Sequence, residues 1–454
     1  MAGGIFVLKE YASEYCGKTV GFVGMGVSNL PVIRLFISAG AKCTVRDKND
    51  LSSRDFYQEL KNAGVTFITG EGYLENIDET LLFLSPAVRP DLKGLDTARN
   101  NGTRITSEME EFFSLCPCKK IAVTGSDGKT TTTTLIAKLL EAQGYKVWLG
   151  GNIGVNLFAT LDDIKSDDYA VIELSSFLLM KLSSSPDIAV VTNVAPNHLD
   201  WHTDMNEYVE AKKRIFAFQN KDSKLVLNLD DEYANEFLVS AKGSVLTISG
   251  NTEDGDIYFN ENGIFEKGIG LLVADDDIKI VGRHNRYNYS AAYSAIKHLV
   301  TKETLIKVAM EFGGVEHRIE FVREVNGVRY YNSSIDSSPS RTTACINAFK
   351  TPIIAICGGY DKNIPYEPLG ELFKSKVKYT VLCGATAKKI AAVFDSVGYR
   401  ESTGAGDFEE ALRYAAEKAV CGDSVVLTPA SASFDMFKNF AERGETFKKI
   451  INTL

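Results

Sequence analysis

Apolar runs of strand length alternate with amphipathic helical patterns along most of the chain. The first example is an apolar run at residues 19–23, a glycine-containing turn at 24–26, a helical pattern from Leu30 to Ser38 and a second strand that ends at Asp47. A strand, a helix and a further strand in this order form a βαβ unit, in which the two strands lie parallel. The pattern therefore predicts a parallel sheet covered by helices.

The same alternation begins again in the second part of the chain. The helical pattern Glu108–Leu115 precedes β-branched apolar strands at residues 120–124, 169–173 and 188–193. A more polar stretch at residues 251–277 predicts short antiparallel strands and turns, and a helix over about 286–300 follows it.

A third part begins near Val315 with a hairpin at residues 321–331, where Asn326-Gly327 is a typical two-residue turn. Apolar strands follow at residues 353–357, 379–383 and 424–427. A chain of 454 residues is too long for one hydrophobic core. We therefore expect an α/β protein with three domains, each built on a mostly parallel sheet flanked by helices: residues 1–107, 108–314 and 315–454.

Composition and charge argue against a nucleic-acid-binding protein, a secreted protein and a membrane protein. Lys and Arg number 50 against 59 Asp and Glu, a net charge of −9, and no basic run stands out, so a nucleic-acid surface is not expected. The N-terminus does not resemble a signal peptide, and no apolar stretch is long enough for membrane insertion. Eight scattered cysteines suit a reducing cytoplasm, and we interpret Cys116-Pro117-Cys118 as structural.

The strongest chemical signal lies between an apolar strand and an amphipathic helix. We call it the phosphate loop, and it is the run Gly125, Ser126, Asp127, Gly128, Lys129, Thr130 and Thr131. Glycines let backbone N–H groups converge on anionic oxygens, and a helix N-terminus adds a favourable dipole. Lys129 would contact the β- and γ-phosphates of ATP, and the Thr130 hydroxyl would ligate Mg²⁺. The spacing is the shorter GxxGKT form, because residue 123 is Val. The alternative is an ordinary turn between a strand and a helix.

A second glycine-containing turn partly matches the dinucleotide-binding fingerprint. It reads Gly24-Met25-Gly26-Val27-Ser28-Asn29, with Asp47 at the end of the next strand. Asn29 stands where the fingerprint has its third glycine. Two interpretations stay open: a nucleotide moiety binds at this turn, or the turn is only structural.

Polar side chains follow several other predicted strands. Glu173 ends an apolar strand downstream of the phosphate loop, where it would ligate Mg²⁺ or else cap a helix. His198 follows the next strand, Lys362 follows a strand of the third part, and His317-Arg318 opens that part. Polar groups at strand ends in all three parts are what an active site between domains requires.

These residues belong to a longer series of motifs that carries a family resemblance. In chain order the motifs are GSDGKTTTT, ELSSF, TNVAPNHLD, YVEAK, GRHNRYN, EHR, GGYDKN and SASFDMFKNF. The series resembles the Mur ligases over essentially the whole chain, and within that family the members that add D-glutamate to UDP-N-acetylmuramoyl-L-alanine. The resemblance implies a Rossmann-like N-terminal domain for the UDP substrate, a P-loop central ATPase domain and a Rossmann-like C-terminal domain for the amino acid.

The resemblance also implies roles for individual residues. Catalytic roles would belong to Lys129, His198 and Lys212. The nucleotide would be bound by the phosphate loop together with Asn288, Arg318 and Asp336, the last because Ser333 stands where many relatives have an aspartate. Two magnesium ions would be bound by Thr130, Glu173, His198 and Lys212, with Lys212 carbamylated to give an anionic oxygen ligand. Substrate contacts would come from Val27, Ser28, Asp47, Asn152, Ser175, Ser337, Lys362, Ser433 and Phe440.

The implied reaction uses ATP and Mg²⁺ to activate a carboxylate. Transfer of the γ-phosphoryl group to the L-alanine carboxylate gives an acyl phosphate, and the amine of D-glutamate then displaces phosphate. The resemblance implies a monomer in the bacterial cytoplasm that makes a peptidoglycan precursor. One departure is Leu178, which follows ELSSF where a glutamine is frequent.

Two kinds of alternative remain open. The first is another Mur ligase or a folylpolyglutamate synthase-like enzyme, against which SASFDMFKNF and the N-terminal pattern argue. The second is a nucleotide-switched binding protein without ligase activity. The chain has no NKxD motif for reading guanine, and a switch would not need so many polar groups on the acceptor side.

Overall fold

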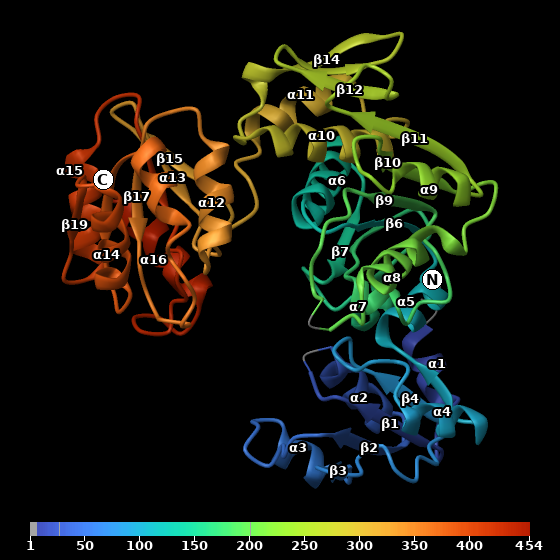
Figure 1. Cartoon of the computed structure of the whole chain (residues 1–454). Coiled ribbons are helices and arrows are strands. Elements are labelled where there is room, and N and C mark those ends of the chain that lie inside the picture. The colour runs from blue at the N-terminus through green and yellow to red at the C-terminus, as the bar shows by residue number, and fades with distance from the viewer. Residues whose placement is uncertain (1–6, 27, 200) are drawn as a thin grey trace. The chain divides into compact units, whose positions relative to one another are not determined.

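A computed structural model describes residues 7–26, 28–199 and 201–454 (Figure 1). It contains three β-sheets with helices packed against them, and the α/β fold predicted from the sequence is confirmed. The chain forms two compact units. The first runs to Leu272 and includes Tyr287–Leu305, and the second comprises Val273–Arg286 and Ile306–Leu454. No helix in the described part of the chain is both long and apolar enough to cross a membrane.

The first sheet has the strand order β3-β2-β1-β4-β5, and all neighbouring strands run parallel. Its strands are β1 (Thr19–Val23), β2 (Lys42–Asp47), β3 (Thr66–Thr69), β4 (Leu81–Leu84) and β5 (Arg104–Thr106), with helices α1 (Val7–Ser13), α2 (Asn29–Ser38), α3 (Tyr57–Asn62) and α4 (Lys93–Asn100). Because β1 lies between β2 and β4, the strand order reverses at β1. The glycine turn after β1 therefore lies at the crevice where parallel sheets bind ligands.

A buried ion pair fixes the end of β2. Arg46 and Glu79 are each about 2% exposed, and the guanidinium donates to both carboxylate oxygens, at 2.7 and 3.2 Å. The remaining N–H groups of Arg46 donate to the carbonyl oxygens of Tyr73, Glu75 and Asn76. This network holds the residue directly before Asp47 in one conformation.

The second sheet has the order β14-β13-β12-β11-β10-β9-β6-β8-β7. Its strands are β6 (Lys119–Thr124), β7 (Val147–Gly151), β8 (Tyr169–Glu173), β9 (Ile188–Val191), β10 (Lys224–Asn228), β11 (Ser244–Ser249), β12 (Ile257–Asn260), β13 (Gly263–Glu266) and β14 (Gly270–Ala274). The helices are α5 (Glu108–Leu115), α6 (Lys129–Gln143), η1 (Phe158–Asp163), α7 (Ser176–Leu179), α8 (Met205–Ala217), α9 (Ala234–Ser240), η2 (Asp275–Asp277), α10 (Arg283–Ile296) and α11 (Lys302–Glu311). Strands β6 to β11 pair in parallel, whereas β12 and β13 are antiparallel, as the polar stretch predicts.

The third sheet has the order β15-β16-β20-β17-β18-β19. Its elements are β15 (Glu320–Val325), β16 (Val328–Asn332), α12 (Pro339–Ala348), β17 (Ile353–Cys357), α13 (Leu369–Lys376), β18 (Val377–Leu382), α14 (Ala387–Val397), β19 (Ser402–Gly404), α15 (Phe408–Lys418), β20 (Ser424–Leu427) and α16 (Phe440–Ile451). The predicted hairpin is confirmed as β15–β16, and Asn326 and Gly327 both have positive φ, at 52° and 76°, as its tight turn requires.

Several predicted limits move by a few residues, among them those of the strand predicted at 379–383, which is β18 (Val377–Leu382). The strand predicted at 188–193 ends at Val191, and the helix predicted over about 286–300 is α10, which begins at Arg283 and ends at Ile296. Hydrophobic periodicity does not detect the polar first turn of α10. It also does not detect that Thr192 and Asn193, which continue the run of residues favourable for a strand, leave the sheet to bind another loop.

The first and second sheets are joined by polar contacts within the first compact unit. Arg89, which follows β4, donates to the carbonyl oxygen of Trp201 at 2.7 Å and forms an ion pair with Glu207 at 2.6 Å. Asn156 donates to the carbonyl oxygen of Ser28 at 3.1 Å. These bonds connect the glycine turn after β1 and the loop after β4 to the elements around the phosphate loop.

Glu108 is a buried acid at the start of α5, the helix that leads from the first sheet to the second. A helix N-terminus would favour its charged form. Burial has the larger effect and raises the pKa of the carboxyl to about 7, although a hydrogen bond from the backbone of Phe158 opposes this. Glu108 therefore keeps its proton over a pH range in which an unfolded chain would release it.

Replacing Glu108 by Gln is expected to flatten the pH dependence of stability. Between the usual pKa of 4.5 and the folded value of about 7, the folded protein binds more protons than the unfolded chain, so the free energy of unfolding falls as pH rises. The loss is up to about 3 kcal/mol, and Glu108→Gln removes the titrating group. Urea unfolding at about pH 5 and about pH 8 measures this loss of unfolding free energy in the wild type and in Glu108→Gln. The exposed Glu14→Gln is the control, and equal pH dependence of wild type and Glu108→Gln would contradict the assignment.

Candidate active site

The phosphate loop connects β6 to α6, and its two glycines adopt conformations that other residues avoid. Gly125 has φ 151° and Gly128 has φ 79°. A Cβ atom at Gly125 would overlap the hydroxyl of Thr192, and one at Gly128 would overlap the side-chain oxygen of Asn288. The loop therefore requires glycine at both positions for backbone and steric reasons. Gly128 ends the loop as the N-cap of α6, whose first turn carries no acidic side chain.

The loop is held by residues that follow β9. Ser126 Oγ lies 2.8 Å from both the backbone nitrogen and the carbonyl oxygen of Ala195. The backbone N–H of Asp127 donates to the Asn193 side chain at 2.9 Å, and the Thr192 hydroxyl donates to the Asp127 carbonyl at 2.6 Å. Sequence reasoning did not select Thr192 or Asn193 for this role, because only their spatial neighbours reveal it.

Two lysines converge on the same carbonyl oxygen of the loop. Lys129 Nζ donates to Gly125 O at 3.0 Å and to Ser126 O at 2.9 Å. Lys212 Nζ, from α8, donates to Gly125 O at 2.7 Å and lies 4.3 Å from the centre of the Tyr208 ring. Burial, and then the charge of Lys129, hold the pKa of Lys212 well below its usual range. The structure thus brings Lys212 to the phosphate loop, 87 residues away in sequence from Gly125.

Glu173 ends β8 and is 1% exposed. Its Oε1 accepts a hydrogen bond from Asn152 Nδ2 at 3.0 Å, and among the described residues its buried Oε2 has no hydrogen-bond donor. A buried carboxylate oxygen without a donor is costly unless a cation or water binds it. Ser175 lies two residues further on, where its hydroxyl caps α7 by accepting from Leu178 N.

His198 has a positive φ of 54° in the loop after β9, and its ring contacts Phe177 with centroids 5.0 Å apart. The nearby His202 was not selected from the sequence. It is buried, with Nε2 2.9 Å from Ser176 Oγ and Nδ1 3.2 Å from Glu207 Oε2. Burial lowers its pKa, so His202 is a neutral link between α7 and α8 rather than a charged group.

Asn288 on α10 also lies at the phosphate loop. Its side-chain oxygen accepts from the Thr132 hydroxyl at 3.2 Å and is the atom that excludes a side chain at Gly128.

In the first sheet, Asp47 Oδ2 accepts from Met25 N at 3.0 Å, and the Ser28 carbonyl is bonded to Asn156. Val27 lies outside the described residues.

Among the predicted residues of the second compact unit, Lys362 and Ser337 lie near each other, with Lys362 Nζ 3.5 Å from Ser337 Oγ. Ser433 is buried, and Phe440 is exposed. Asp336 is buried and accepts from the Thr428 hydroxyl at 2.9 Å, and burial raises its pKa to about 6.

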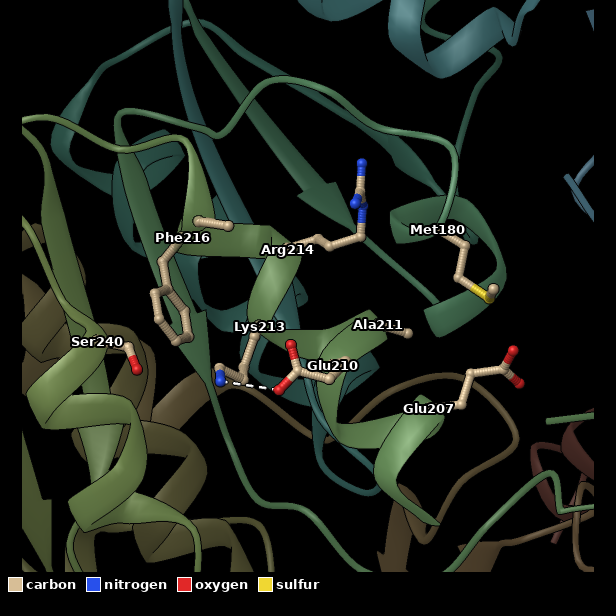
Figure 2. Close-up of a pocket in the computed structure, with 9 residues that line it drawn as sticks. Met180, Glu207, Glu210, Ala211, Lys213, Arg214, Phe216 and Ser240 are labelled. Carbon is tan, nitrogen blue, oxygen red and sulfur yellow. Dashed lines mark hydrogen bonds and ion pairs between the residues drawn. The ribbon is translucent and has the colours of Figure 1, made fainter. Parts of the chain in front are cut away.

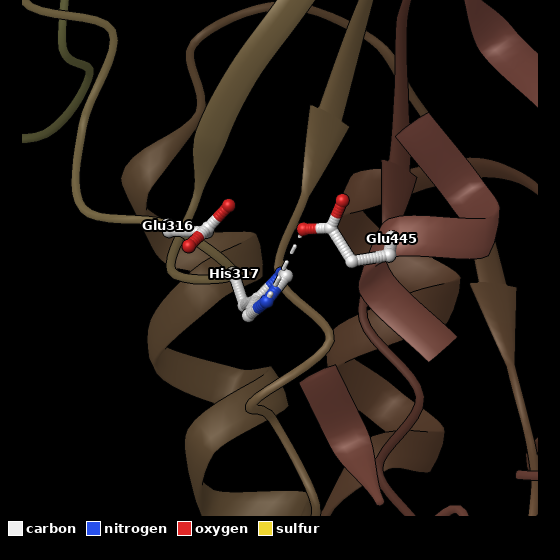
Figure 3. Close-up of side chains that lie close together, drawn as sticks. All are labelled: Glu316, His317 and Glu445. Atoms are coloured by element: carbon white, nitrogen blue, oxygen red, sulfur yellow. Dashed lines mark ion pairs between the residues drawn. The ribbon is translucent and has the colours of Figure 1, made fainter. Parts of the chain in front are cut away.

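Arg318 lies between two residues with left-handed backbone, His317 at φ 63° and Ile319 at φ 45°. Figure 3 shows His317 with Glu316 and Glu445, the group in the described part of the chain whose spacing would suit a metal ion. Lys448 already forms ion pairs with both of these carboxylates, so its ammonium supplies the positive charge there. The ion pairs with Lys448 therefore balance the charge of these carboxylates without a metal ion.

A groove of 470 Å³ lies on the other side of α8 from Lys212 (Figure 2). Lys213 and Glu210 line it and form an ion pair at 2.8 Å. Lys212, one residue earlier, is buried against the phosphate loop instead. None of the predicted site residues lines this groove.

Comparisons with known proteins relate the chain to one family. The description "Mur ligase middle domain" matches residues 123–296, and "Mur ligase, glutamate ligase domain" matches residues 317–431. The chain is 46% identical to the UDP-N-acetylmuramoylalanine–D-glutamate ligase of Acetivibrio thermocellus, over 98% of this chain and 99% of the relative. It is also 46% identical to the ligase of the same name from Clostridium acetobutylicum, over 98% of each chain.

Solved structures share the fold at much lower identity. UDP-N-acetylmuramate-alanine ligase MurC from Thermotoga maritima has a TM-score of 0.59 at 17% identity, over 96% of this chain and 99% of that one. MurF from Acinetobacter baumannii has a TM-score of 0.58 at 13% identity, over 98% of each chain. At these identities the likeness concerns the fold alone.

Proposed function

This chain belongs to the Mur ligase family, and we propose that it is an ATP-dependent amide ligase that joins D-glutamate to UDP-N-acetylmuramoyl-L-alanine. The observation that carries the proposal is 46% identity to ligases of that name over 98% of the chain. This similarity includes the second compact unit, which would bind the acceptor amino acid. The product is a precursor of peptidoglycan, made in the bacterial cytoplasm by a monomer that needs neither nucleic acid nor membrane insertion.

The reaction begins with activation of a carboxylate, which by itself is a poor electrophile. The γ-phosphoryl group of ATP is transferred to the L-alanine carboxylate, which gives an acyl phosphate. The amine of D-glutamate attacks the carbonyl carbon, and the tetrahedral intermediate expels phosphate as the amide forms. Lys129, which now donates to Gly125 and Ser126, would turn to the β- and γ-phosphates and offset the charge of the transfer.

Thr130 and Glu173 would hold one Mg²⁺ ion at the phosphates. The fit rests on Glu173, whose buried Oε2 is unpaired among the described residues while Oε1 is fixed by Asn152. Carboxylate and hydroxyl oxygens are the ligands that Mg²⁺ prefers. The ion would screen the negative charge of the phosphates during transfer. Asn152, which bonds to Glu173, and Ser175, two residues after this acid, would contact the muramoyl part of the substrate.

His198 and Lys212 would hold a second Mg²⁺ ion, with Lys212 carbamylated. Burial disfavours the charged ammonium, and its lowered pKa leaves the neutral amine that reacts with CO₂. The nitrogen forms a bond to the carbon of CO₂ and releases a proton, so the neutral amine beside Lys129 becomes an anionic oxygen ligand. The new negative charge would attract the ammonium of Lys129.

The remaining assignments follow the three proposed domains, 1–107, 108–314 and 315–454. Val27, Ser28 and Asp47 would contact the uracil end of the UDP substrate. Asn288, Arg318 and Asp336 would complete the nucleotide site. Asp336 is suited to replace the family aspartate at Ser333, because the Ser333 side chain bonds to its carboxyl and the charge of Arg318 lies near it. D-Glutamate would be bound by Ser337, Lys362, Ser433 and Phe440, with Lys362 as a cation for a dicarboxylate.

One assay tests the proposal. Phosphate release from ATP is measured with UDP-N-acetylmuramoyl-L-alanine while D-glutamate, L-glutamate, L-lysine or meso-diaminopimelate is added in turn. We expect stimulation by D-glutamate alone, together with a product whose mass equals that of both substrates less one water. Stimulation by another amino acid and not by D-glutamate would refute the proposed specificity while leaving the family assignment in place.

A further inference from the structure

Arg443 is a buried arginine on α16 whose hydrogen bonds all go to neutral oxygens. Its side chain is 1% exposed. The guanidinium donates to Ser334 Oγ at 3.0 Å and Ser334 O at 2.8 Å, and to the carbonyl oxygens of Ser431 and Ala432, each at 3.1 Å. A buried cation bonded only to neutral acceptors carries a desolvation cost that a purely structural contact does not require.

The guanidinium contacts the segments that follow three neighbouring strands of the third sheet. Ser334 follows β16, and Ser431 and Ala432 follow β20. Gly359 follows β17, and a Cβ atom there would lie 3.1 Å from Arg443 Nη1. Because β16, β20 and β17 are adjacent and parallel, their carboxyl ends meet at one edge. One side chain therefore sets the spacing of all three loops.

Each of these loops carries a residue proposed to bind D-glutamate. Ser337 lies three residues after Ser334, Lys362 lies three residues after Gly359, and Ser433 directly follows Ala432. The Ser334 hydroxyl that accepts from Arg443 also donates to the backbone carbonyl of Phe440 at 2.7 Å. Ser337 and Ser433 therefore follow residues that bond to the guanidinium, Lys362 follows a residue packed against it, and Phe440 is linked to it through Ser334.

Arg443 keeps its positive charge at the edge of the third sheet where the three loops meet. Burial lowers its pKa to about 10, and Asp435 and Asp336 oppose the shift without hydrogen bonding to the guanidinium. The group is therefore a cation at neutral pH. A cation in a low-dielectric surrounding favours an anionic ligand nearby, and D-glutamate brings a second carboxylate that a monocarboxylic amino acid lacks.

We propose that Arg443 is a positioning residue of the acceptor site: it fixes the three loops that bind the amino acid, and its charge favours a dicarboxylate. The inference rests on the proposed function, because it names D-glutamate as the acceptor. Arg443 does not touch the reacting atoms. Its removal should therefore affect the acceptor amino acid more than ATP or the UDP substrate.

Comparing Arg443→Lys with Arg443→Met distinguishes the effect of the hydrogen-bond geometry of Arg443 from the effect of its positive charge. Arg443→Lys keeps the positive charge but loses the planar guanidinium that donates several hydrogen bonds at once. We therefore expect the KM for D-glutamate to rise about tenfold, while the KM for ATP changes less than about twofold. Arg443→Met also loses the charge, and the KM for D-glutamate should rise about 100-fold. Ser334→Ala removes one acceptor and leaves the cation, so it should give a smaller rise and serves if Arg443→Met does not fold.

The matched controls are Arg413→Lys and Arg413→Met on α15 of the same unit, where the side chain is 63% exposed. These should leave every KM unchanged. Without any substrate, amide hydrogen exchange in the segments 332–337 and 430–434 should be faster in Arg443→Lys than in Arg413→Lys, because the loops lose their shared anchor.

The outcomes distinguish this inference from the proposed function. Equal increases in the KM values of all three substrates would mean a general structural role and overturn the inference. Unchanged D-glutamate KM and unchanged exchange in Arg443→Lys would overturn it as well. If the unmodified protein is not stimulated by D-glutamate, the proposed function fails, and hydrogen exchange still decides whether Arg443 fixes the loops.

Discussion

Replacing Lys129 by alanine is expected to reduce D-glutamate-dependent phosphate release by at least about 10³-fold, because Lys129 is the residue proposed to offset the charge of the transferred phosphoryl group. Lys129 begins α6, and its ammonium already lies at the loop, bonded to Gly125 and Ser126. The alanine is a good helix former, so α6 should persist. Steady-state phosphate release and far-ultraviolet circular dichroism measure the two properties.

Lys138→Ala on the same helix is the control for Lys129→Ala. Lys138 is exposed and pairs with Glu141 one turn away, so its loss changes the charge of α6 without touching the loop. Its activity should stay within about twofold of wild type, since exposed pairs contribute little. If Lys129→Ala retained most of its activity with the fold intact, the phosphate loop would not be the site of ATP chemistry.

Replacing Glu79 by alanine is expected to destabilise the first sheet by about 3–5 kcal/mol, because it leaves Arg46 as a buried cation without its carboxylate. The pair is about 2% exposed, and its two hydrogen bonds are 2.7 and 3.2 Å long. Arg46 directly precedes Asp47, a proposed contact of the UDP substrate. The KM for that substrate should therefore rise with the loss of stability. Urea unfolding and steady-state kinetics measure the two effects.

Helices α2 and α3, which flank the same sheet, carry a matched pair at the surface. Arg34 and Glu59 form two hydrogen bonds of similar length, at 2.8 and 2.7 Å, but both side chains are about half exposed. Glu59→Ala should therefore cost far less stability than Glu79→Ala. Combining Arg46→Met with Glu79→Leu should restore much of the stability lost in Glu79→Ala, since an apolar pair of similar volume leaves no buried charge. A large loss in Glu59→Ala would show that burial is not the deciding factor.

The fold follows from short-range patterns to a large extent. The runs at 19–23, 169–173, 353–357 and 424–427 are strands with those limits, because each consists mainly of apolar residues and is short. Asn326-Gly327 predicts the β15–β16 hairpin for a local steric reason, since both residues tolerate positive φ. The limits of β9 and α10 are less accurate, because polar residues at the ends bond to residues outside the element: Thr192 to Asp127 and Arg286 to Asp275.

Some residues of the candidate site can likewise be predicted from the sequence, whereas others are found only in the structure. Gly125, Gly128 and Lys129 are recognisable in the sequence, because a phosphate loop needs glycine torsions and a lysine within a few consecutive residues. Thr192 and Asn193 act on that loop through hydrogen bonds across some 65 residues of chain, and no local pattern predicts such a contact. His202 is a similar case, since only its position between Ser176 and Glu207 distinguishes it from an ordinary loop histidine.

The sequence by itself determined the α/β alternation, the phosphate loop and the series of motifs that identifies the family, because each depends on residues close together in the chain. Only the tertiary structure decided what surrounds them. Burial against the loop lowers the pKa of Lys212, the end of β8 leaves one oxygen of Glu173 without a donor, and three parallel strands bring their loops to Arg443. Desolvation and hydrogen-bond satisfaction depend on which distant segments pack together, and hydrophobic periodicity along the chain carries no information about that packing.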